Sequence, residues 1–330
     1  TPVRDEITPL LPSDPAGYVI NSDVMIGAFR KDWVGGLSLA EAKYLWWIKA
    51  PASLVAPPTS IGSWVMLGFR DGTLMKVEAV SGKVVWRVNL DSFVNRQVVL
   101  AGTRLIVVTA AQNVYGLDFQ TGTNQWIFDG GFPDELTMRG GAAPVVHTGK
   151  VIVGLHTGEL IALSVETGKL QWRYNPSYNE ARFHNIVGQL VIRNEKLYLT
   201  RFDGLVGAVS LNGPARELSW QEKLPALITS VFREGRLYLG AVNGDVYAYD
   251  LATGRQIWRT NIGDSAAQLV AAEELIYVAG ANGRLAALKV GNGAFHWVDD
   301  IGGDIASAPL IYDKQIIFPT GLRNLYAYSL

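Results

Sequence analysis

The sequence has 330 residues and no cysteine, so disulfide bonds, thiolate zinc sites and cysteine nucleophiles are excluded. Charge is also scarce, because Asp, Glu, Lys and Arg make up 18% of the residues and the formal net charge is −1. This balance leaves no cationic excess for nucleic-acid phosphates or an anionic membrane surface. The longest apolar runs are far shorter than the roughly 20 residues of a membrane-spanning helix. With 48% hydrophobic residues, the chain is expected to fold around a large core, with no nucleic-acid partner and no membrane span.

Signatures of catalysis are absent as well. The sequence contains no phosphate-binding P-loop, no dinucleotide-binding glycine motif, no nucleophile elbow and no zinc-binding His-Glu-x-x-His. Its four histidines are spread over different parts of the chain, which argues against a metal site. The neighbouring acids Glu273-Glu274 and Asp299-Asp300 point to opposite faces if they lie on strands, so neither is a facing carboxylate pair. We therefore expect no catalytic residue, no metal and no bound cofactor, and hence no enzyme.

Glycine and tryptophan are abundant, with 35 and 10 residues. A short segment with a glycine near its start and a tryptophan at its end recurs along the chain. Its clear copies are SGKVVW (81–86), TGTNQW (121–126), TGKLQW (167–172), TGRQIW (253–258) and NGAFHW (292–297). With two degenerate copies, the series of tryptophans is Trp46, Trp86, Trp126, Trp172, Trp220, Trp258 and Trp297. Consecutive members are 38 to 48 residues apart, so the period is close to forty.

A second turn signal recurs inside most periods, before the first one. Its copies are Asp71-Gly72, Thr157-Gly158, Asp203-Gly204, Asn243-Gly244 and Asn282-Gly283. Such pairs suit two-residue hairpin loops, and the flanking residues alternate apolar and polar. Each period is therefore predicted to be a four-stranded antiparallel meander. Repeats of this length and kind stack radially as the blades of a β-propeller, with the tryptophans packed between blades.

The two ends of the repeat predict how the ring closes. The last unit stops before any strand that ends in tryptophan, and the strand around Trp46 stands at the front without a blade of its own. Residues 43–50 are therefore expected to supply the outer strand of the last blade, which hides both edges. This gives an all-β, seven-bladed propeller over residues 43–330. Residues 1–42 are expected to be an extension, either a strap packed on the ring or a tether.

The repeat resembles that of a known family. The segments AYDLATGRQIW (248–258) and LDFQTGTNQW (117–126) are similar to the repeat of the pyrroloquinoline-quinone propellers. Within that class, DELTMRGGAAPVV (134–146) resembles a segment of the BamB family, periplasmic lipoproteins of the outer-membrane β-barrel assembly machine. The resemblance implies a periplasmic protein, with a lipid anchor upstream of Thr1 that tethers it to the outer membrane. It also implies that Leu136, Met138 and Arg139 dock onto the periplasmic domain of the barrel-forming subunit.

Two features depart from that family. Its members have eight blades, whereas the tryptophan count gives seven. A pair of acids that the family carries before the following blade falls here at about Asn185 and Val187, so both acids are missing.

The two longest periods place their extra residues in loops after Trp126 and Trp172, between one blade and the next. The second loop carries Tyr178, Arg182 and Phe183, which are expected to lie on the same face as the first loop. Apolar side chains mixed with arginine are typical of protein interfaces, although they also cover the ends of blades.

The sequence thus predicts a non-enzymatic periplasmic scaffold that binds an envelope protein through these loops, in outer-membrane β-barrel assembly. A glycan- or peptidoglycan-binding envelope module is one alternative. A quinone-dependent dehydrogenase is another, although the absence of cysteine excludes the vicinal cysteine pair that many such enzymes carry.

Overall fold

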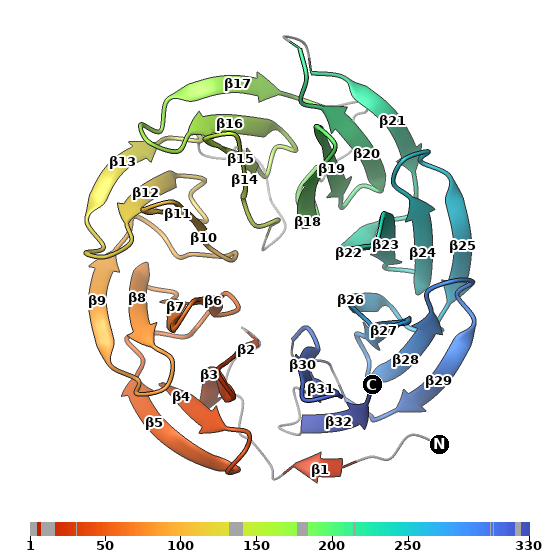
Figure 1. Ribbon diagram of the computed structural model, residues 1–330, viewed down its shortest axis with the longest axis horizontal. Helices are drawn as coiled ribbons and strands as arrows, with labels where there is room; N and C mark the ends of the chain where they lie inside the picture. Colours follow the sequence, from red (N-terminus) through yellow and green to blue (C-terminus); the bar gives the residue numbers. More distant parts are fainter. Residues whose placement is uncertain are drawn as a thin grey trace. The chain divides into compact units, whose positions relative to one another are not determined.

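The computed structural model describes residues 5–7, 17–30, 32–131, 141–176, 184–213, 216–303, 305, 307–320 and 325–330, with 5–7 described by their backbone alone. These residues form eight four-stranded antiparallel sheets, which are the blades of an all-β propeller (Figure 1). By its internal contacts the chain divides into two compact units, Ala16–Ile186 and Thr1–Pro15 with Val187–Leu330. Each unit holds four of the sheets.

In the unit Ala16–Ile186, the strands of each sheet pair in chain order. The four sheets are β2 (Tyr18–Asn21), β3 (Val24–Arg30), β4 (Trp33–Ser38) and β5 (Lys43–Lys49); β6 (Thr59–Ile61), β7 (Trp64–Gly68), β8 (Thr73–Glu78) and β9 (Val84–Asn89); β10 (Val99–Ala101), β11 (Arg104–Val108), β12 (Val114–Asp118) and β13 (Asn124–Phe128); and β14 (Val145–His147), β15 (Lys150–Gly154), β16 (Leu160–Ser164) and β17 (Leu170–Tyr174).

The other unit has three sheets of the same kind and one that joins distant parts of the chain. The three are β18 (Ile186–Arg193), β19 (Lys196–Arg201), β20 (Leu205–Ser210) and β21 (Leu218–Lys223); β22 (Leu227–Arg233), β23 (Arg236–Ala241), β24 (Asp245–Asp250) and β25 (Gln256–Asn261); and β26 (Ala266–Ala272), β27 (Leu275–Gly280), β28 (Arg284–Lys289) and β29 (Phe295–Asp300). The fourth has the order β1 (Asp5–Ile7), β32 (Leu325–Ser329), β31 (Gln315–Pro319) and β30 (Leu310–Tyr312).

The predicted count of seven blades is wrong. The strand around Trp46, β5, pairs with β4 and completes a blade made by residues 18–49. The outer strand of the last blade comes from the N-terminal segment, as predicted, but from β1, which pairs with β32 through Asp5↔Ala327, Glu6↔Tyr326 and Ile7↔Leu325. Four strands, β1 to β4, therefore lie within residues 1–42, which were expected to be an extension.

The first blade escaped the sequence prediction because its turns use residues other than glycine. The hairpin between β2 and β3 has Ser22 and Asp23 at φ 47° and 63°, and Asp32 and Ala42 occupy the next two turns at φ 62° and 50°. Positive φ is uncommon for residues with a side chain, and asparagine or aspartate adopts it more readily than most. A search for Asp-Gly, Asn-Gly and Thr-Gly therefore passes over this blade.

The glycines of the repeat pack against the tryptophans of the preceding blade. A Cβ added to Gly168, the glycine of TGKLQW, would lie 2.5 Å from the Trp126 ring of the preceding blade, and Gly168 has φ 67°. Trp126 in turn faces Gly116 on its own sheet, where an added Cβ would lie 2.1 Å from the indole. Glycine is thus required by both conformation and space. Gly82, Gly122, Gly254 and Gly293 meet Trp46, Trp86, Trp220 and Trp258 in the same manner.

The indole nitrogens add a hydrogen bond to this packing. Each of four indoles donates to a main-chain carbonyl of the next blade: Trp46 to Ala79 at 2.9 Å, Trp86 to Phe119 at 3.1 Å, Trp126 to Val165 at 2.9 Å and Trp258 to Val290 at 2.9 Å. The apolar core lies around these contacts, between consecutive sheets, as where Val24 and Ile26 of β3 pack with Val65 and Leu67 of β7.

One blade interface contains a buried lysine. Opposite its tryptophan, each of six blades has glycine or alanine on the third strand, but the β6–β9 blade has Lys76 opposite Trp86. The side chain is fully buried, and Nζ donates to the Phe119 carbonyl at 3.0 Å and lies 4.6 Å from the Trp64 ring centre. Burial lowers the pKa of Lys76, with Asp118 acting in the opposite direction.

Candidate partner-binding loops

The six side chains predicted to bind a partner lie outside the described residues. Leu136, Met138 and Arg139 fall within residues 132–140, and Tyr178, Arg182 and Phe183 fall within 177–183. The structure does describe the residues on either side of both segments. These flanks, which we call the loop bases, comprise Asp129–Gly131, Gly141–Pro144, Asn175–Pro176 and His184–Ile186.

The two loop bases are joined to each other. The amide of Ala142, just after the first segment, donates to the carbonyl of Ile186, just after the second, at 3.2 Å. Ala142 and Ile186 are both buried, at 0% and 1% exposed. The hydrogen bond shows that the described residues directly after the two segments meet at one place.

Arg96 lies directly behind this junction. Its side chain, in the connection between β9 and β10, is 2% exposed. Nη1 donates to the carbonyls of Gly154 at 2.9 Å and Ala142 at 3.4 Å, and Nε donates to Asn95 Oδ1 at 3.3 Å. Within the described residues, Nη2 has no hydrogen-bond partner and no carboxylate pairs with the guanidinium. Burial lowers the pKa of Arg96 to about 10.

Gln112 occupies the turn between β11 and β12, on the same blade as Arg96. Its Oε1 accepts a hydrogen bond from the amide of His156, on the next blade, at 3.0 Å. Its own carbonyl closely approaches the first loop base, since a Cβ on Gly130 would lie 2.2 Å from that oxygen. Gln112 is 2% exposed and has φ 68°, a conformation that favours glycine.

Sequence reasoning missed Arg96 and Gln112, although a signal was present. Three residues before the first strand of three other blades stand Ala56, Ala142 and Ser307, all buried, where this blade has Arg96. The β11–β12 turn has Gln112 where equivalent turns have glycine, as at Gly72. Both residues are departures from the repeat, and comparison of equivalent positions would have identified them.

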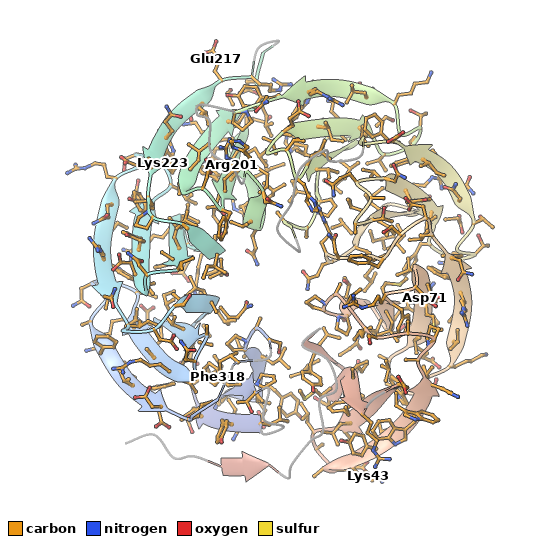
Figure 2. All side chains as sticks on the ribbon, turned by 180° about the vertical axis from the view of Figure 1, so that it is seen from behind. Lys43, Asp71, Arg201, Glu217, Lys223 and Phe318 are labelled. Atoms are coloured by element: carbon orange, nitrogen blue, oxygen red, sulfur yellow. The ribbon has the colours of Figure 1, made fainter. Side chains whose placement is uncertain are left out.

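Acidic side chains in the unit Val187–Leu330 are held by nearby donors. Arg201 Nη2 and Lys223 Nζ lie 2.5 and 3.1 Å from Asp203 Oδ2. Figure 2 labels the two cations, Arg201 on β19 and Lys223 on β21. Burial raises the pKa of Asp203, but these two cations outweigh it and the net shift is downward.

Asp245 is fully buried and accepts hydrogen bonds from Arg259 at 2.7 Å and Asn261 at 3.0 Å, as well as from Tyr247 and Asn243. Burial raises its pKa, and these hydrogen bonds lower it by more. Both carboxylates therefore have structural partners.

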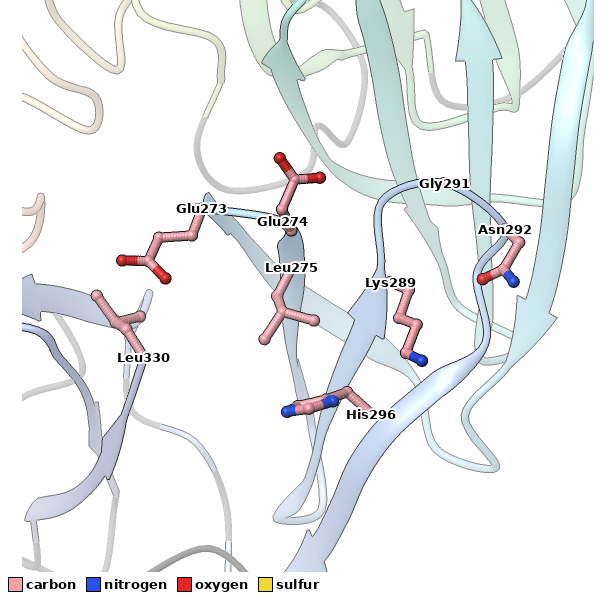
Figure 3. Close-up of a pocket in the computed structure, with 8 residues that line it drawn as sticks. All are labelled: Glu273, Glu274, Leu275, Lys289, Gly291, Asn292, His296 and Leu330. Atoms are coloured by element: carbon pink, nitrogen blue, oxygen red, sulfur yellow. The ribbon is translucent and has the colours of Figure 1, made fainter.

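A cavity of about 580 Å³ opens beside β27–β29. Glu273, Glu274, Lys289, Asn292 and His296 line it, and the two carboxylates point in different directions (Figure 3). Among the described residues, no group of three His, Asp or Glu side chains is placed to hold a metal ion. The walls of the cavity are mixed, because Leu275 and Leu330 line it together with these polar residues.

The other acid pair singled out in the sequence also separates. Asp299 accepts a hydrogen bond from the Tyr328 hydroxyl at 2.8 Å, whereas Asp300 pairs with Arg284 at 3.5 Å.

The part of the chain that the structure describes contains no helix that is long and apolar enough to span a bilayer.

Comparison with known proteins decides the family. A family model described as outer membrane protein assembly factor BamB matches residues 30–260 and 242–330. The chain belongs to the BamB family. The resemblance inferred from the repeat is thereby confirmed.

Individual BamB relatives are distant in sequence. Outer membrane protein assembly factor BamB of Moranella endobia (strain PCIT) is 27% identical over 294 residues, which cover 80% of this chain and 72% of that protein. The BamB of Yersinia pestis is 26% identical over 268 residues, which cover 81% of this chain and 58% of that protein, less than two thirds of its length.

Solved structures share the fold. BamB from Moraxella catarrhalis superimposes with a TM-score of 0.84 at 19% identity, covering 99% of this chain and 100% of that one. Quinohemoprotein alcohol dehydrogenase from Comamonas testosteroni gives a TM-score of 0.79 at 12% identity, covering 99% of this chain and 76% of that one. At such identities the likeness concerns the fold alone, and the dehydrogenase carries no argument for an enzymatic activity here.

Proposed function

We propose that this BamB-family chain is a non-enzymatic periplasmic scaffold that acts in the assembly of outer-membrane β-barrel proteins. The observation that carries the proposal is the match of the BamB family model over residues 30–260 and 242–330. The fold suits such a role, because blades that are locked to one another by buried indoles present their connecting loops from a rigid frame.

The partner in this proposal is the barrel-forming subunit of the assembly machine, bound through its periplasmic domain. The binding residues are Leu136, Met138 and Arg139 of the first loop, with Tyr178, Arg182 and Phe183 of the second. The hydrogen bond between Ala142 and Ile186 supports one composite surface, because it brings the bases of both loops together. Apolar anchors beside arginine are the residue types that dominate binding energy at protein interfaces.

The test is an affinity measurement with purified proteins. The periplasmic domain of the barrel-forming subunit from the same bacterium is titrated with the wild type and with the variants Leu136→Ala and Arg139→Glu. Each variant is expected to weaken binding by about tenfold or more, as truncation of an interface anchor does. Melting temperatures should remain those of the wild type, because neither position belongs to a blade strand that the structure describes.

Matched controls separate this site from general surface effects. Ile127→Ala removes an apolar side chain that is 53% exposed on β13, and Arg70→Glu reverses an exposed arginine on a turn of another blade. Both should bind as the wild type does. A wild type that fails to bind the domain would refute the proposed partner, and equal affinities for Leu136→Ala, Arg139→Glu and the controls would remove these loops from the interface.

A further inference from the structure

We propose that the cavity beside β27–β29 is a docking site for a turn of a partner protein, one in which glycine is followed by lysine or arginine. The residues that line the cavity belong to the unit that holds Val187–Leu330. The site therefore uses other residues than the loops proposed above and does not depend on them. It is recognised by comparing Trp297 with the tryptophans of the repeat that a turn of the following blade covers.

The last blade differs from the others in how its outer strands are connected. In the other seven blades the third and fourth strands follow each other in the chain. The outermost strand of the last blade is β1, from the N-terminal segment, so no turn joins it to β32. Leu330 stands where such a turn would begin, because its amide donates to the Lys314 carbonyl at 2.8 Å. The amide of Val290, which begins the turn between β28 and β29, donates to the Glu274 carbonyl in the equivalent way at 3.0 Å.

The cavity opens at this place. Leu275 and Leu330 line it, and both also pack on the apolar core between the β26–β29 sheet and the last blade. Figure 3 shows the side chains of Glu273 and His296 directed toward the side on which Leu330 lies. Trp297, next to His296, is half-buried, whereas four other tryptophans of the repeat are 7–9% exposed. The volume of about 580 Å³ falls within the roughly 300–1,000 Å³ of ligand-binding pockets.

Two hydrogen-bond donors at this interface have no acceptor within the described residues. In the two preceding interfaces a tyrosine lies beside a tryptophan, and one of the two bonds to the covering turn. The Tyr198 hydroxyl donates to a carbonyl of that turn at 3.1 Å, and the Trp258 indole does so at 2.9 Å. Tyr277 and Trp297 form the corresponding pair, with ring centres 6.1 Å apart, and in the described part of the chain neither donates a hydrogen bond. The pair thus offers donors to an added turn.

The covering turns show which residue such a surface accepts. Gly254, at φ 70°, lies against the Trp220 ring, where an added Cβ would be 2.7 Å from the indole. Gly293, at φ 69°, lies against the Trp258 ring in the same way, at 2.5 Å. Both the conformation and the space require glycine. A turn that covers Trp297 in this manner must therefore carry glycine at the equivalent place.

The charges around the cavity favour a basic residue in the turn. The carboxylates of Glu273 and Glu274 line the cavity together with a single lysine, Lys289. In another blade interface Arg104, at the start of β11, pairs with Glu166 of the following turn at 3.7 Å, so a charge at this end of a blade does contact the covering turn. Opposite charges across an interface select the partner and its orientation. The repeat itself has basic residues directly after the glycine at Lys83, Lys169 and Arg255.

The test uses a cyclic peptide with the sequence of residues 251–257, LATGRQI, and protein labelled with 5-fluorotryptophan. Fluorine NMR follows Trp297, whose signal is the one missing from Trp297→Phe. We expect the peptide to shift this signal in a saturable manner. The peptide with Gly254→Ala should bind about tenfold or more weakly, because the added methyl group meets the ring. The absence of a saturable shift, or equal binding of the two peptides, would overturn the proposal.

Variants of the protein separate the cavity from the surface around it. Leu275→Trp should abolish binding by filling the cavity, and Glu273→Lys should weaken it about threefold to fivefold by removing an ion pair with the arginine. The matched controls are Glu217→Lys, which reverses an exposed acid in the same unit, and Phe295→Ala, which removes a ring that is 45% exposed on β29. Both should bind as the wild type does. Glu273 is exposed, so Glu273→Lys keeps the test decisive if Leu275→Trp is unstable. Wild-type affinity in Glu273→Lys or Leu275→Trp would overturn the proposal.

The same experiment identifies two other occupants. A Trp297 signal that shifts with protein concentration alone would assign the cavity to a second copy of this chain. Peptide binding that appears only after removal of residues 1–4, which precede β1, would assign the cavity to the chain itself. Either result would overturn the proposal of a partner. The function proposed above would stand in both cases, because its test involves different residues.

Discussion

The indole hydrogen bond between blades leads to a quantitative prediction. Trp126 donates to the Val165 carbonyl at 2.9 Å, and no other donor reaches that oxygen within the described residues. Trp220 packs on Gly254 in the equivalent way, but within the described residues its indole nitrogen is buried without a partner, and the Leu251 carbonyl accepts from the Tyr198 hydroxyl at 3.1 Å. Replacing each tryptophan by phenylalanine removes the same atoms and differs in one hydrogen bond.

The magnitude follows from that difference. Trp126→Phe loses a hydrogen bond worth about 0.5–1.5 kcal/mol and leaves a buried carbonyl unsatisfied, which costs about 1–3 kcal/mol. Trp220→Phe loses similar packing but also removes a buried donor that had no acceptor, which offsets part of the loss. We expect Trp126→Phe to be the more destabilising variant by about 2 kcal/mol, or about 4–8 °C in melting temperature for a cooperative unit of this size.

Urea unfolding followed by far-UV circular dichroism measures this, since it does not depend on tryptophan fluorescence. Incorporation of 3-benzothienylalanine at position 126 is a sharper control, because it keeps the shape of the ring and replaces the N–H by sulfur. It should reproduce most of the loss seen with phenylalanine. Equal losses at positions 126 and 220, or a full return of stability with the sulfur analogue, would show that packing alone holds the blades and would refute the reasoning.

Three further predictions concern the blades and their charges. Gly168→Ala should destabilise by at least about 2 kcal/mol more than Gly149→Ala in thermal melts, because both glycines have positive φ, 67° and 72°, but only Gly168 would place a Cβ against a ring. Asp245→Asn should lower the free energy of unfolding at pH 7 by about 2–3 kcal/mol and flatten the decline of stability in acid. Folding lowers the pKa of Asp245, so the carboxylate stabilises the protein above the ordinary carboxyl pKa, and this contribution is lost as the pH falls through the folded value. Lys76→Met should be neutral or stabilising in urea titrations at pH 7. In the wild type, stability should rise between neutral and alkaline pH, because folding lowers the pKa of Lys76 and between the folded and unfolded pKa values the unfolded chain binds more protons. Lys76→Met should abolish this rise. Equal losses of stability in Gly168→Ala and Gly149→Ala would contradict the first prediction, and an unchanged acid profile of Asp245→Asn would contradict the second. A large loss of stability in Lys76→Met would contradict the third.

Much of the fold could be predicted from the sequence, because the repeat encodes contacts between neighbouring blades. The four-stranded antiparallel blade follows from two turn signals and a tryptophan, and the pairing Ala248↔Trp258 places that tryptophan opposite a small residue, as packing requires. The blade count failed at the first blade because Ser22, Asp23 and Ala42 take the conformations that glycine takes elsewhere. The residue type is a weak guide to φ at such turns. Only the strand pairing, β5 with β4 and β1 with β32, shows which segment belongs to which blade.

The candidate site was predictable only as far as its location. The long intervals after Trp126 and Trp172 identify two interblade loops, and the Ala142–Ile186 hydrogen bond joins their bases. Arg96 and Gln112 are polar residues in polar-looking connections, and nothing in their immediate neighbours indicates that both are buried. Their burial results from the approach of the next blade, a contact between residues more than forty positions apart.

The outermost strand of the last blade, β1, is held by a short pairing with β32. Its outermost strand is attached through three residue pairs, whereas β5 is attached to its blade through six. Under mechanical load, heating or proteolysis near the front of the chain, β1 is the strand expected to peel away first. The row of amides and carbonyls along β32 would then stand open as a template for a strand from another molecule. Release of this short strand would therefore leave one side of the last blade without its antiparallel neighbour.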